Sequence, residues 1–245
     1  RTPIGRQIRK AFIAPEGRVL LAADYSQIEL RLMAHFSQDD ALVHAFQQGQ
    51  DVHRRTASEV LGIAIEDVTH DQRRQAKAVN FGLLYGMSEF GLTRQLGFTR
   101  EESRSYIARY FQRYPGVLDY MERTRQIARE QGFVETILGR RLYTPDIMAT
   151  NKMIKQAAER AAINAPLQGS AADIIKLAMI AVDKVLPKDQ AKLLLQVHDE
   201  LVFEADVAIA DELSKQIAEV MQSVLEISVP FVVEVGQGLN WDAAH

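Results

Sequence analysis

The sequence has 245 residues, of which 47% are hydrophobic, and a formal net charge of −3. That length allows a sizeable core in one large domain or two smaller ones. The absence of cysteine excludes disulfides and thiolate metal sites, so a bound metal needs oxygen or imidazole ligands, which favours Mg²⁺ or Mn²⁺. No apolar run reads as a membrane span, and the N-terminus has no secretory segment. We therefore expect a cytoplasmic protein without a membrane partner.

The charges are distributed unevenly along the chain. Residues 71–160 carry 16 basic and 10 acidic side chains, whereas residues 161–245 carry 5 basic and 13 acidic ones. A basic middle segment is typical of a subdomain that faces a polyanion, although solvated basic helices give the same pattern. The chain does not begin with methionine, which suggests a fragment or a processed piece.

Apolar periodicity predicts the elements in chain order. The expected elements are strands within 11–23 around Gly17, helices over 27–36, 40–48, 52–61, 70–85, 88–96, 100–114 and 116–131, a hairpin over 135–142, helices over 151–164 and 168–186, strands over 192–197 and 201–205, a helix over 207–225 and a strand over 229–235. Thr69 and Gln72 fit a capping box, and Pro166 is expected to break or kink a helix. Terminal strands around a helical middle predict an α+β fold with a helical insertion.

Two apolar strands lead into aspartates that are far apart in sequence. Asp24 ends one strand, and Asp199 follows the other in His198-Asp199-Glu200. A charge at such a place must lie at a sheet edge or in a cleft, because burying it unpaired is costly. Two adjacent carboxylates suit a pair of metal ions about 4 Å apart that act on a phosphoryl group. Aspartate is also common in turns, so this pattern alone leaves both interpretations open.

The predicted helix over 70–85 carries a stripe that changes from cationic to aromatic. Arg73, Lys77, Phe81 and Tyr85 recur every four residues and therefore share one face. Cations can bind phosphates and aromatic rings can bind a base or sugar, so the stripe suits a nucleotide. A basic solvent face that grades into core aromatics is the alternative.

A third stripe combines Arg160, Asn164 and Gln168, again four residues apart. Long hydrogen-bonding side chains on one helical face can contact phosphates, sugars or groove acceptors of DNA. Local capping around Pro166 is the alternative for Asn164.

Together these segments resemble the three motifs of family A DNA polymerases. Residues 24–31, Asp-Tyr-Ser-Gln-Ile-Glu-Leu-Arg, resemble motif A; residues 73–86, from Arg73 to Gly86, resemble motif B; and residues 197–200, Val-His-Asp-Glu, resemble motif C. The motifs occur in the family's order, and the similarity extends to Asn240-Trp241-Asp242.

The resemblance implies a right-hand polymerase fold in which this chain supplies palm and fingers. The palm, a small antiparallel sheet with helices, would comprise residues 1–50 and 165–245, and the helical fingers residues 51–164. The thumb and exonuclease-like domains would precede the chain, so the thumb is absent from it. A monomer joined to those domains would act on primer–template DNA and dNTPs in the bacterial nucleoid.

The resemblance also implies residue roles at the chemical centre. Asp24, Asp199 and the Tyr25 carbonyl would ligate two Mg²⁺ ions, for which Mn²⁺ can substitute. Lys77 would act as general acid, and Glu200 would have a supporting catalytic role.

The remaining roles concern substrate binding. The nucleotide-binding set would be Gln27, Glu29, His53, Arg73, Lys77, Phe81 and Tyr85. Within this set, Glu29 would reject a ribose 2′-hydroxyl, and Phe81 would discriminate against dideoxynucleotides. The DNA-binding set would be Arg1, Arg160, Asn164, Gln168 and His198.

Two rival functions follow from the same residues. A carboxylate two-metal nuclease shares the acidic pair, but the nucleotide stripe argues against it. The other rival is a DNA-binding module that is inactive as an isolated fragment, because phosphate contacts of the thumb are missing.

Overall fold

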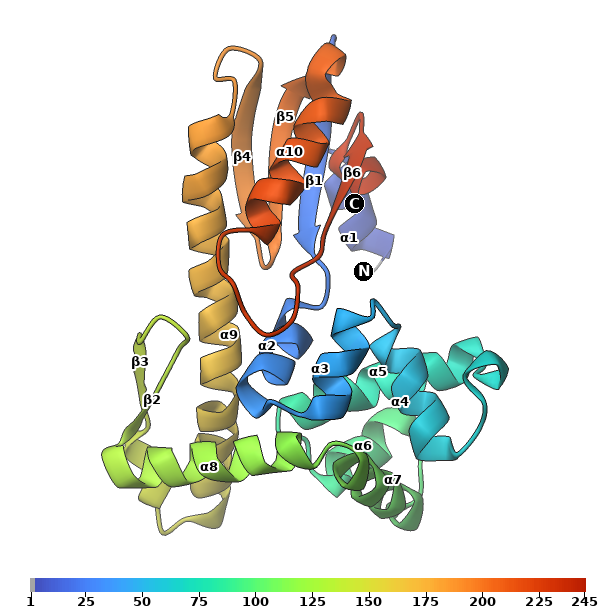
Figure 1. The fold of residues 1–245 in the computed structure, drawn as a ribbon, viewed down its shortest axis with the longest axis vertical. Coiled ribbons are helices and arrows are strands. Elements are labelled where there is room, and N and C mark those ends of the chain that lie inside the picture. The colour runs from blue at the N-terminus through green and yellow to red at the C-terminus, as the bar shows by residue number, and fades with distance from the viewer. Residues whose placement is uncertain (1–2) are drawn as a thin grey trace. The chain divides into compact units, whose positions relative to one another are not determined.

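The computed structural model describes residues 3–245, which form two compact units (Figure 1). Unit 1 comprises the described residues up to Ile28, with Ala171–Glu226 and Pro230–His245, and unit 2 comprises Glu29–Ser170 with Ile227–Val229. This division reflects contacts within each unit. The functional division into residues 1–50, 51–164 and 165–245 stays a prediction.

Unit 1 is built on a four-stranded antiparallel sheet in the order β4-β5-β1-β6. Its elements are α1 (Pro3–Lys10), β1 (Arg18–Tyr25), β4 (Ala191–Val197), β5 (Glu200–Asp206), the 3₁₀ turn η3 (Val207–Ile209), α10 (Ala210–Gln222), β6 (Val233–Gly238) and α11 (Trp241–Ala244). Together with the helices of unit 2, this antiparallel sheet confirms the predicted α+β class.

The inner strand β1 is apolar because both of its faces are covered. Leu20, Leu21, Ala22 and Ala23 are all buried. Leu20 and Ala22 pack with Trp241 of α11 on one face. On the other face, the hydroxyl of Tyr25 donates a hydrogen bond of 2.5 Å to the Met221 carbonyl in α10. A strand buried on both faces reads as a continuous hydrophobic run, which is the pattern that predicted it.

Unit 2 is mainly helical. Its elements are α2 (Ile28–Ser37), α3 (Asp40–Gln47), α4 (Val52–Leu61), η1 (Ile65–Asp67), α5 (His70–Leu84), α6 (Glu89–Leu96), α7 (Arg100–Arg113), α8 (Pro115–Gln131), β2 (Phe133–Glu135), β3 (Arg141–Tyr143) and η2 (Pro145–Met148). The first residue of α2, Ile28, is still counted with unit 1. The capping box of Thr69 and Gln72 is confirmed at the start of α5. Gly86, with φ of 68°, follows the end of this helix.

The long helix α9 (Lys152–Val185) contributes residues to both units. Pro166 was expected to break or kink a helix. The break is wrong, because Pro166 lies inside this helix. A helix-interior proline costs about 3 kcal/mol. Burial of Ala162, Ile163 and Leu167 around it stabilises the helical form. By length and hydropathy α9 is apolar enough to cross a membrane, but core helices of soluble proteins share these properties, and 44% of its most apolar window is buried.

Other differences lie near the ends of elements. The expected strand before Gly17 is wrong, since only Ile13 forms an isolated bridge, to Asn240, and α1 was not predicted. The last strand starts at Val233 rather than at residue 229. Ser228 instead bonds within unit 2: its N–H donates to His35 Nδ1 at 3.2 Å, and its carbonyl accepts from Gln47 at 3.0 Å. These tertiary contacts override the local apolar pattern.

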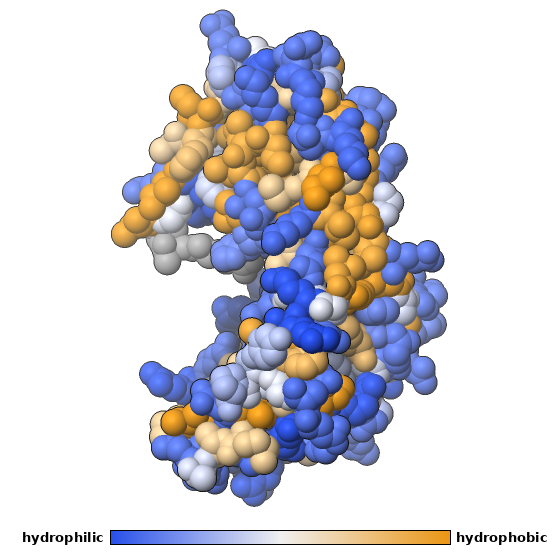
Figure 2. Space-filling model, turned by 90° about the vertical axis from the view of Figure 1, so that its left-hand side faces the viewer, coloured by the Kyte–Doolittle hydropathy of each residue, from blue (hydrophilic) through white to orange (hydrophobic). Residues whose placement is uncertain are grey.

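The surface mixes hydrophilic and apolar residues, as one face shows (Figure 2). In unit 2, several large apolar side chains around the β2–β3 hairpin and the start of α9 are exposed. They are Leu138, Leu142, Tyr143, Met148, Met153 and Ile154. Clusters of this kind are more common at interaction surfaces than on isolated monomers.

Gly236 allows α11 to approach the sheet closely. A Cβ at this position would lie 2.0 Å from the Ala244 carbonyl oxygen. We expect Gly236→Ala to displace α11 and to lower the free energy of unfolding by about 1–3 kcal/mol, the usual range for overpacking. Urea denaturation would measure this change, and an unchanged midpoint would contradict the close packing.

Candidate functional site

The two strand-end aspartates lie on neighbouring strands of unit 1. Asp24 is paired with Glu200 in the β1–β5 register, and the N–H of Tyr25 donates to the Asp199 carbonyl at 3.2 Å. Directly opposite residues of antiparallel strands have Cβ atoms about 5 Å apart. The fold therefore brings the backbone segments of Asp24 and Asp199, which are 175 positions apart in the sequence, next to each other.

Unusual backbone conformations flank this acidic pair. His198 is the first residue of the two-residue β4–β5 loop and has φ of 55°, and Gln27, just after β1, has φ of 56°. Positive φ at the first loop residue is what type I′ and II′ hairpins require. Outside glycine such conformations are costly, and they are concentrated at functional sites. The Oε1 atom of Gln27 is also buried without a hydrogen-bond partner.

Glu200 is turned toward the C-terminal segment. It is only 3% exposed. Its carboxylate accepts a hydrogen bond from Trp241 Nε1 at 2.5 Å and lies 2.6 Å from His245 Nδ1. These partners occupy both carboxylate oxygens. The arrangement suits a structural role beside the acidic pair better than direct ligation.

The donor atoms at these strand ends fit a hard divalent cation. Asp24, Asp199 and the Tyr25 carbonyl offer oxygen only, and Mg²⁺ is commonly held by one or two carboxylates together with substrate phosphates and water. Glu234 lies opposite Asp24 on β6, which adds another carboxylate to the same row. Within the described part of the chain, residues 3–245, no three His, Asp or Glu side chains form a complete metal cage. Two carboxylates and a backbone carbonyl are a donor set of the kind that Mg²⁺ accepts.

The Tyr25 side chain holds its strand end in place. It is 1% exposed, and its ring packs edge-on against Phe231 at 5.7 Å. Burial raises the pKa of its hydroxyl far above the ordinary value, so this group stays protonated and donates to α10. Only the backbone of Tyr25 is therefore suited to ligation.

In unit 2, the predicted stripe of α5 forms a row with a neighbouring helix. The ring of Phe81 lies 6.4 Å from that of Tyr85 and 5.8 Å from that of His53 in α4. At the end of the row, the Tyr85 hydroxyl donates a hydrogen bond to the Glu29 carboxylate. His53, Phe81, Tyr85 and Glu29 are thus contiguous, as the nucleotide-binding prediction requires.

At the cationic end of the row, Arg73 is paired with Asp51. Its carboxylate accepts from Arg73 Nε at 2.6 Å and also caps α4 by accepting from the Arg54 N–H at 3.0 Å. These hydrogen bonds outweigh the effect of burial and lower the pKa of Asp51. Lys77 follows Arg73 by one helical turn on α5.

His53 is buried and uncharged at neutral pH. It is 1% exposed, and burial lowers its pKa to about 4, although Asp51 acts in the opposite direction. Asn80 Nδ2 lies 3.1 Å from His53 Nδ1, whereas His53 Nε2 is buried without a partner. Asn80 was missed by the sequence analysis. Its position three residues after Lys77, on the same helical face, was the available signal.

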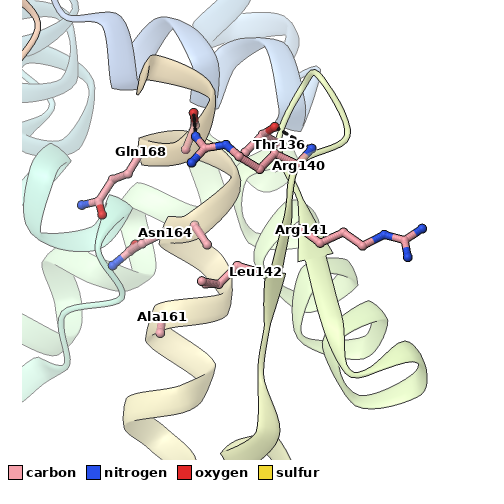
Figure 3. A pocket seen from close by; sticks show the side chains of 9 residues that line it. Thr136, Arg140, Arg141, Leu142, Ala161, Asn164 and Gln168 are labelled. Carbon is pink, nitrogen blue, oxygen red and sulfur yellow. Dashed lines mark hydrogen bonds between the residues drawn. The ribbon is translucent and has the colours of Figure 1, made fainter. Parts of the chain in front are cut away.

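The predicted DNA-binding stripe lies on α9 in unit 2. Asn164 and Gln168 project from the same side of the helix and line a cavity of about 350 Å³ with Arg140 of the β2–β3 hairpin (Figure 3). Arg140 Nη2 donates to the Gly169 carbonyl at 2.7 Å, which fastens the hairpin to α9. Arg160 is exposed, and its side-chain carbons pack against Gly86. Arg1 lies outside the described residues.

The pKa of His53 gives a testable pH dependence. In the unfolded chain this imidazole binds a proton near its ordinary pKa of 6.5, but in the folded protein only near 4. Above pH 6.5 both states are uncharged at His53 and the free energy of unfolding is at its full value. It falls as the pH drops from 6.5 toward 4, by at most about 1.4 kcal/mol per pH unit, because the unfolded chain binds the proton more readily. Urea denaturation should show a larger loss between pH 7 and 5 for the wild-type than for His53→Gln. Equal losses would show that His53 is not buried uncharged.

Comparisons with known proteins show which family the chain belongs to. The sequence profile described as DNA polymerase family A matches residues 1–243. DNA polymerase I of Pseudomonas aeruginosa is 58% identical over all of this chain and 27% of its own length. The thermostable DNA polymerase I of Thermus aquaticus is 49% identical over all of this chain and 29% of its own.

A solved structure of a similar protein has the same fold. The POL domain of Pol1 from M. smegmatis, in complex with DNA primer-template and dNTP, superposes with a TM-score of 0.94 at 46% identity. The match covers all of this chain and 44% of that one. The chain thus spans between a quarter and a third of the curated relatives' length. From these matches we conclude that the chain belongs to DNA polymerase family A.

Proposed function

We propose that this chain is the core of a DNA-directed DNA polymerase, which transfers dNMP units from dNTPs to a primer 3′-hydroxyl and releases pyrophosphate. The observation that carries the proposal is the pairing of β1 with β5, which places Asp24 and Asp199 at adjacent strand ends. A relative that is 46% identical was solved with DNA primer-template and dNTP, which supports the same substrates here.

In this proposal Asp24, Asp199 and the Tyr25 carbonyl hold two Mg²⁺ ions, or Mn²⁺ in their place. When bound, such ions activate the attacking hydroxyl and neutralise charge on the phosphates. The chain's own contribution is to fix the ligand oxygens. The β1–β5 register and the buried anchor of Tyr25 provide that rigidity.

The row in unit 2 binds the nucleotide. Arg73 and Lys77 offer only donors to the triphosphate at neutral pH. The uncharged His53 contacts the triphosphate as well, and Lys77 protonates the departing pyrophosphate oxygen. Phe81 packs against the sugar, and Tyr85 lies beside the templating base. Glu29, held by the Tyr85 hydroxyl, occupies the space of a ribose 2′-hydroxyl. Gln27, a residue of unit 1, is proposed as a further nucleotide contact on the family resemblance alone.

The remaining contacts are made with DNA. Arg160, Asn164 and Gln168 on α9 contact primer and template near the terminus, as does His198. The buried and partnerless Oδ1 atom of Asn164 supports such a contact, because a buried acceptor without a partner is costly. Arg1 is proposed for the same role on the sequence alone.

The longer relatives define the proposed context. A monomer would carry thumb and exonuclease-like domains before this chain and would act in replication and repair in the cytoplasm, at the bacterial nucleoid. A DNA-binding module that is inactive without the thumb is the second candidate. Primer extension by this chain, with and without a thumb-containing fragment, separates the two. Synthesis by the chain alone supports the polymerase core, whereas DNA binding without synthesis by the chain alone would favour the binding module.

The acidic pair gives a direct test by primer extension. We expect Asp24→Asn and Asp199→Asn each to lower the extension rate by about 10³-fold or more, because charge stabilisation by metal contributes several kcal/mol. Binding of primer–template, measured by fluorescence anisotropy, should change little. Asp183→Asn in α9 is a matched control, since Asp183 is exposed and pairs with Lys188. Near-wild-type extension by either site variant would refute the assignment.

The Glu29–Tyr85 contact gives a test of sugar selection. We expect Glu29→Ala to raise ribonucleotide incorporation relative to deoxynucleotide by roughly 100-fold, since a polar group that rejects a hydroxyl is removed. Tyr85→Phe, which removes only the hydroxyl that holds Glu29, should give a smaller shift in the same direction. An unchanged ratio for Glu29→Ala in competitive incorporation assays would contradict the role of Glu29.

A further inference from the structure

A buried polar chain in unit 2 fixes the orientation of the Asn80 side chain. The Thr56 hydroxyl donates to the Val52 carbonyl at 2.8 Å, which uses its only proton. The Asn80 amide atom 3.2 Å from Thr56 Oγ1 must therefore be a donor, which assigns it as Nδ2. The same Nδ2 lies 3.1 Å from His53 Nδ1.

The orientation of Asn80 in turn selects one form of His53. Because Nδ2 donates to Nδ1, that ring nitrogen is an acceptor, and a neutral imidazole then carries its proton on Nε2. Tyr114 also contacts Thr56, at 3.3 Å, and its hydroxyl lies 3.2 Å from Glu59. This second contact gives the Tyr114 proton an acceptor and leaves the Thr56 oxygen available to accept from Asn80.

Two atoms remain unsatisfied in this otherwise bonded cluster. His53 Nε2 and Asn80 Oδ1 are both buried without hydrogen-bond partners. A buried polar atom without a partner costs about 1–3 kcal/mol, so such atoms require an explanation. His53 is 1% exposed, and its charged neighbours are Asp51, Lys77 and Arg73. An Nε2–H donor close to Arg73 and Lys77 calls for an acceptor-only, anionic ligand.

We propose that Asn80 is a positioning residue that holds His53 as its Nε2–H tautomer, so that the uncharged ring donates a hydrogen bond to a phosphate oxygen of the bound nucleotide's triphosphate. The inference deepens the proposed function and rests on it for the identity of the ligand. The tautomer itself follows from the hydrogen bonds of the free protein. Asn80 acts through His53 and does not contact the phosphate.

The first measurement is the tautomer, read from long-range ¹H–¹⁵N spectra of the chain labelled with ¹⁵N-histidine at pH 7. His53→Gln assigns the His53 signals among the six histidines. We expect a protonated Nε2 and an unprotonated Nδ1 in the wild-type. Asn80→Asp, which presents only acceptors to Nδ1, should place a proton there. A protonated Nδ1 in the wild-type would overturn the proposal.

The second measurement is phosphate binding, with inorganic tripolyphosphate as the probe in calorimetry. Asn80→Leu removes the donor at similar volume without adding charge. We expect it to weaken binding about tenfold or more, as for a hydrogen bond to a charged group. In the His53→Gln background the same substitution should have no further effect. An equal effect in both backgrounds would show that Asn80 does not act through His53.

Two further arms identify the ligand and keep the test independent of catalysis. Tripolyphosphate should shift the His53 Nε2 signal, whereas a single-stranded oligonucleotide without terminal phosphate should not; the reverse result would assign the contact to the DNA backbone and overturn the proposal. If Asn80→Leu fails to fold by circular dichroism, the wild-type spectra with and without tripolyphosphate decide the matter. If tripolyphosphate shifts the His53 Nε2 signal of the wild-type chain but that chain extends no primer, the polymerase assignment is refuted and the role of Asn80 is not.

Discussion

The pairing of β1 with β5 is the constraint on which the site of unit 1 depends. It aligns Asp24 with Glu200 and links Tyr25 to Asp199 through a backbone hydrogen bond. A shift of one residue would move Asp24 to the opposite face of the sheet. Burial of β1 on both faces prevents such a shift, because each face fits a different helix. The apolar residues of the strand thus specify where its terminal carboxylate lies.

The site of unit 2 depends on buried polar contacts instead of sheet register. Asp51 caps α4 and binds Arg73 of α5, while Asn80 and Thr56 connect the same two helices beside His53. These contacts join residues that are 22 to 27 positions apart. Buried networks of this kind specify a single arrangement when every member is satisfied, and a member without a partner is costly. The two unsatisfied atoms are therefore informative about a ligand.

Much of this architecture could be predicted from the sequence. The helices with clear periodicity and caps, such as α5 after Thr69, begin where the sequence indicates. The adjacency of Asp24 and Asp199 followed from family resemblance, since strand pairing over 175 positions leaves no local signal. Pro166 within α9 and the later start of β6 were not predictable, because burial of neighbours and the Ser228 contacts override local preference. The role of Asn80 required knowledge of which helix packs against α5.

Metal binding at the paired strand ends tests the central claim most directly. Mn²⁺, a paramagnetic ion, broadens the NMR signals of nuclei close to it and can be titrated into the ¹⁵N-labelled chain. The account predicts that the amides of Tyr25 and Glu200 broaden together at low Mn²⁺ concentrations, and that Asp24→Asn removes both effects. Broadening that is confined to other acidic segments, or that persists in Asp24→Asn, would contradict the claim that β1 and β5 jointly build the metal site.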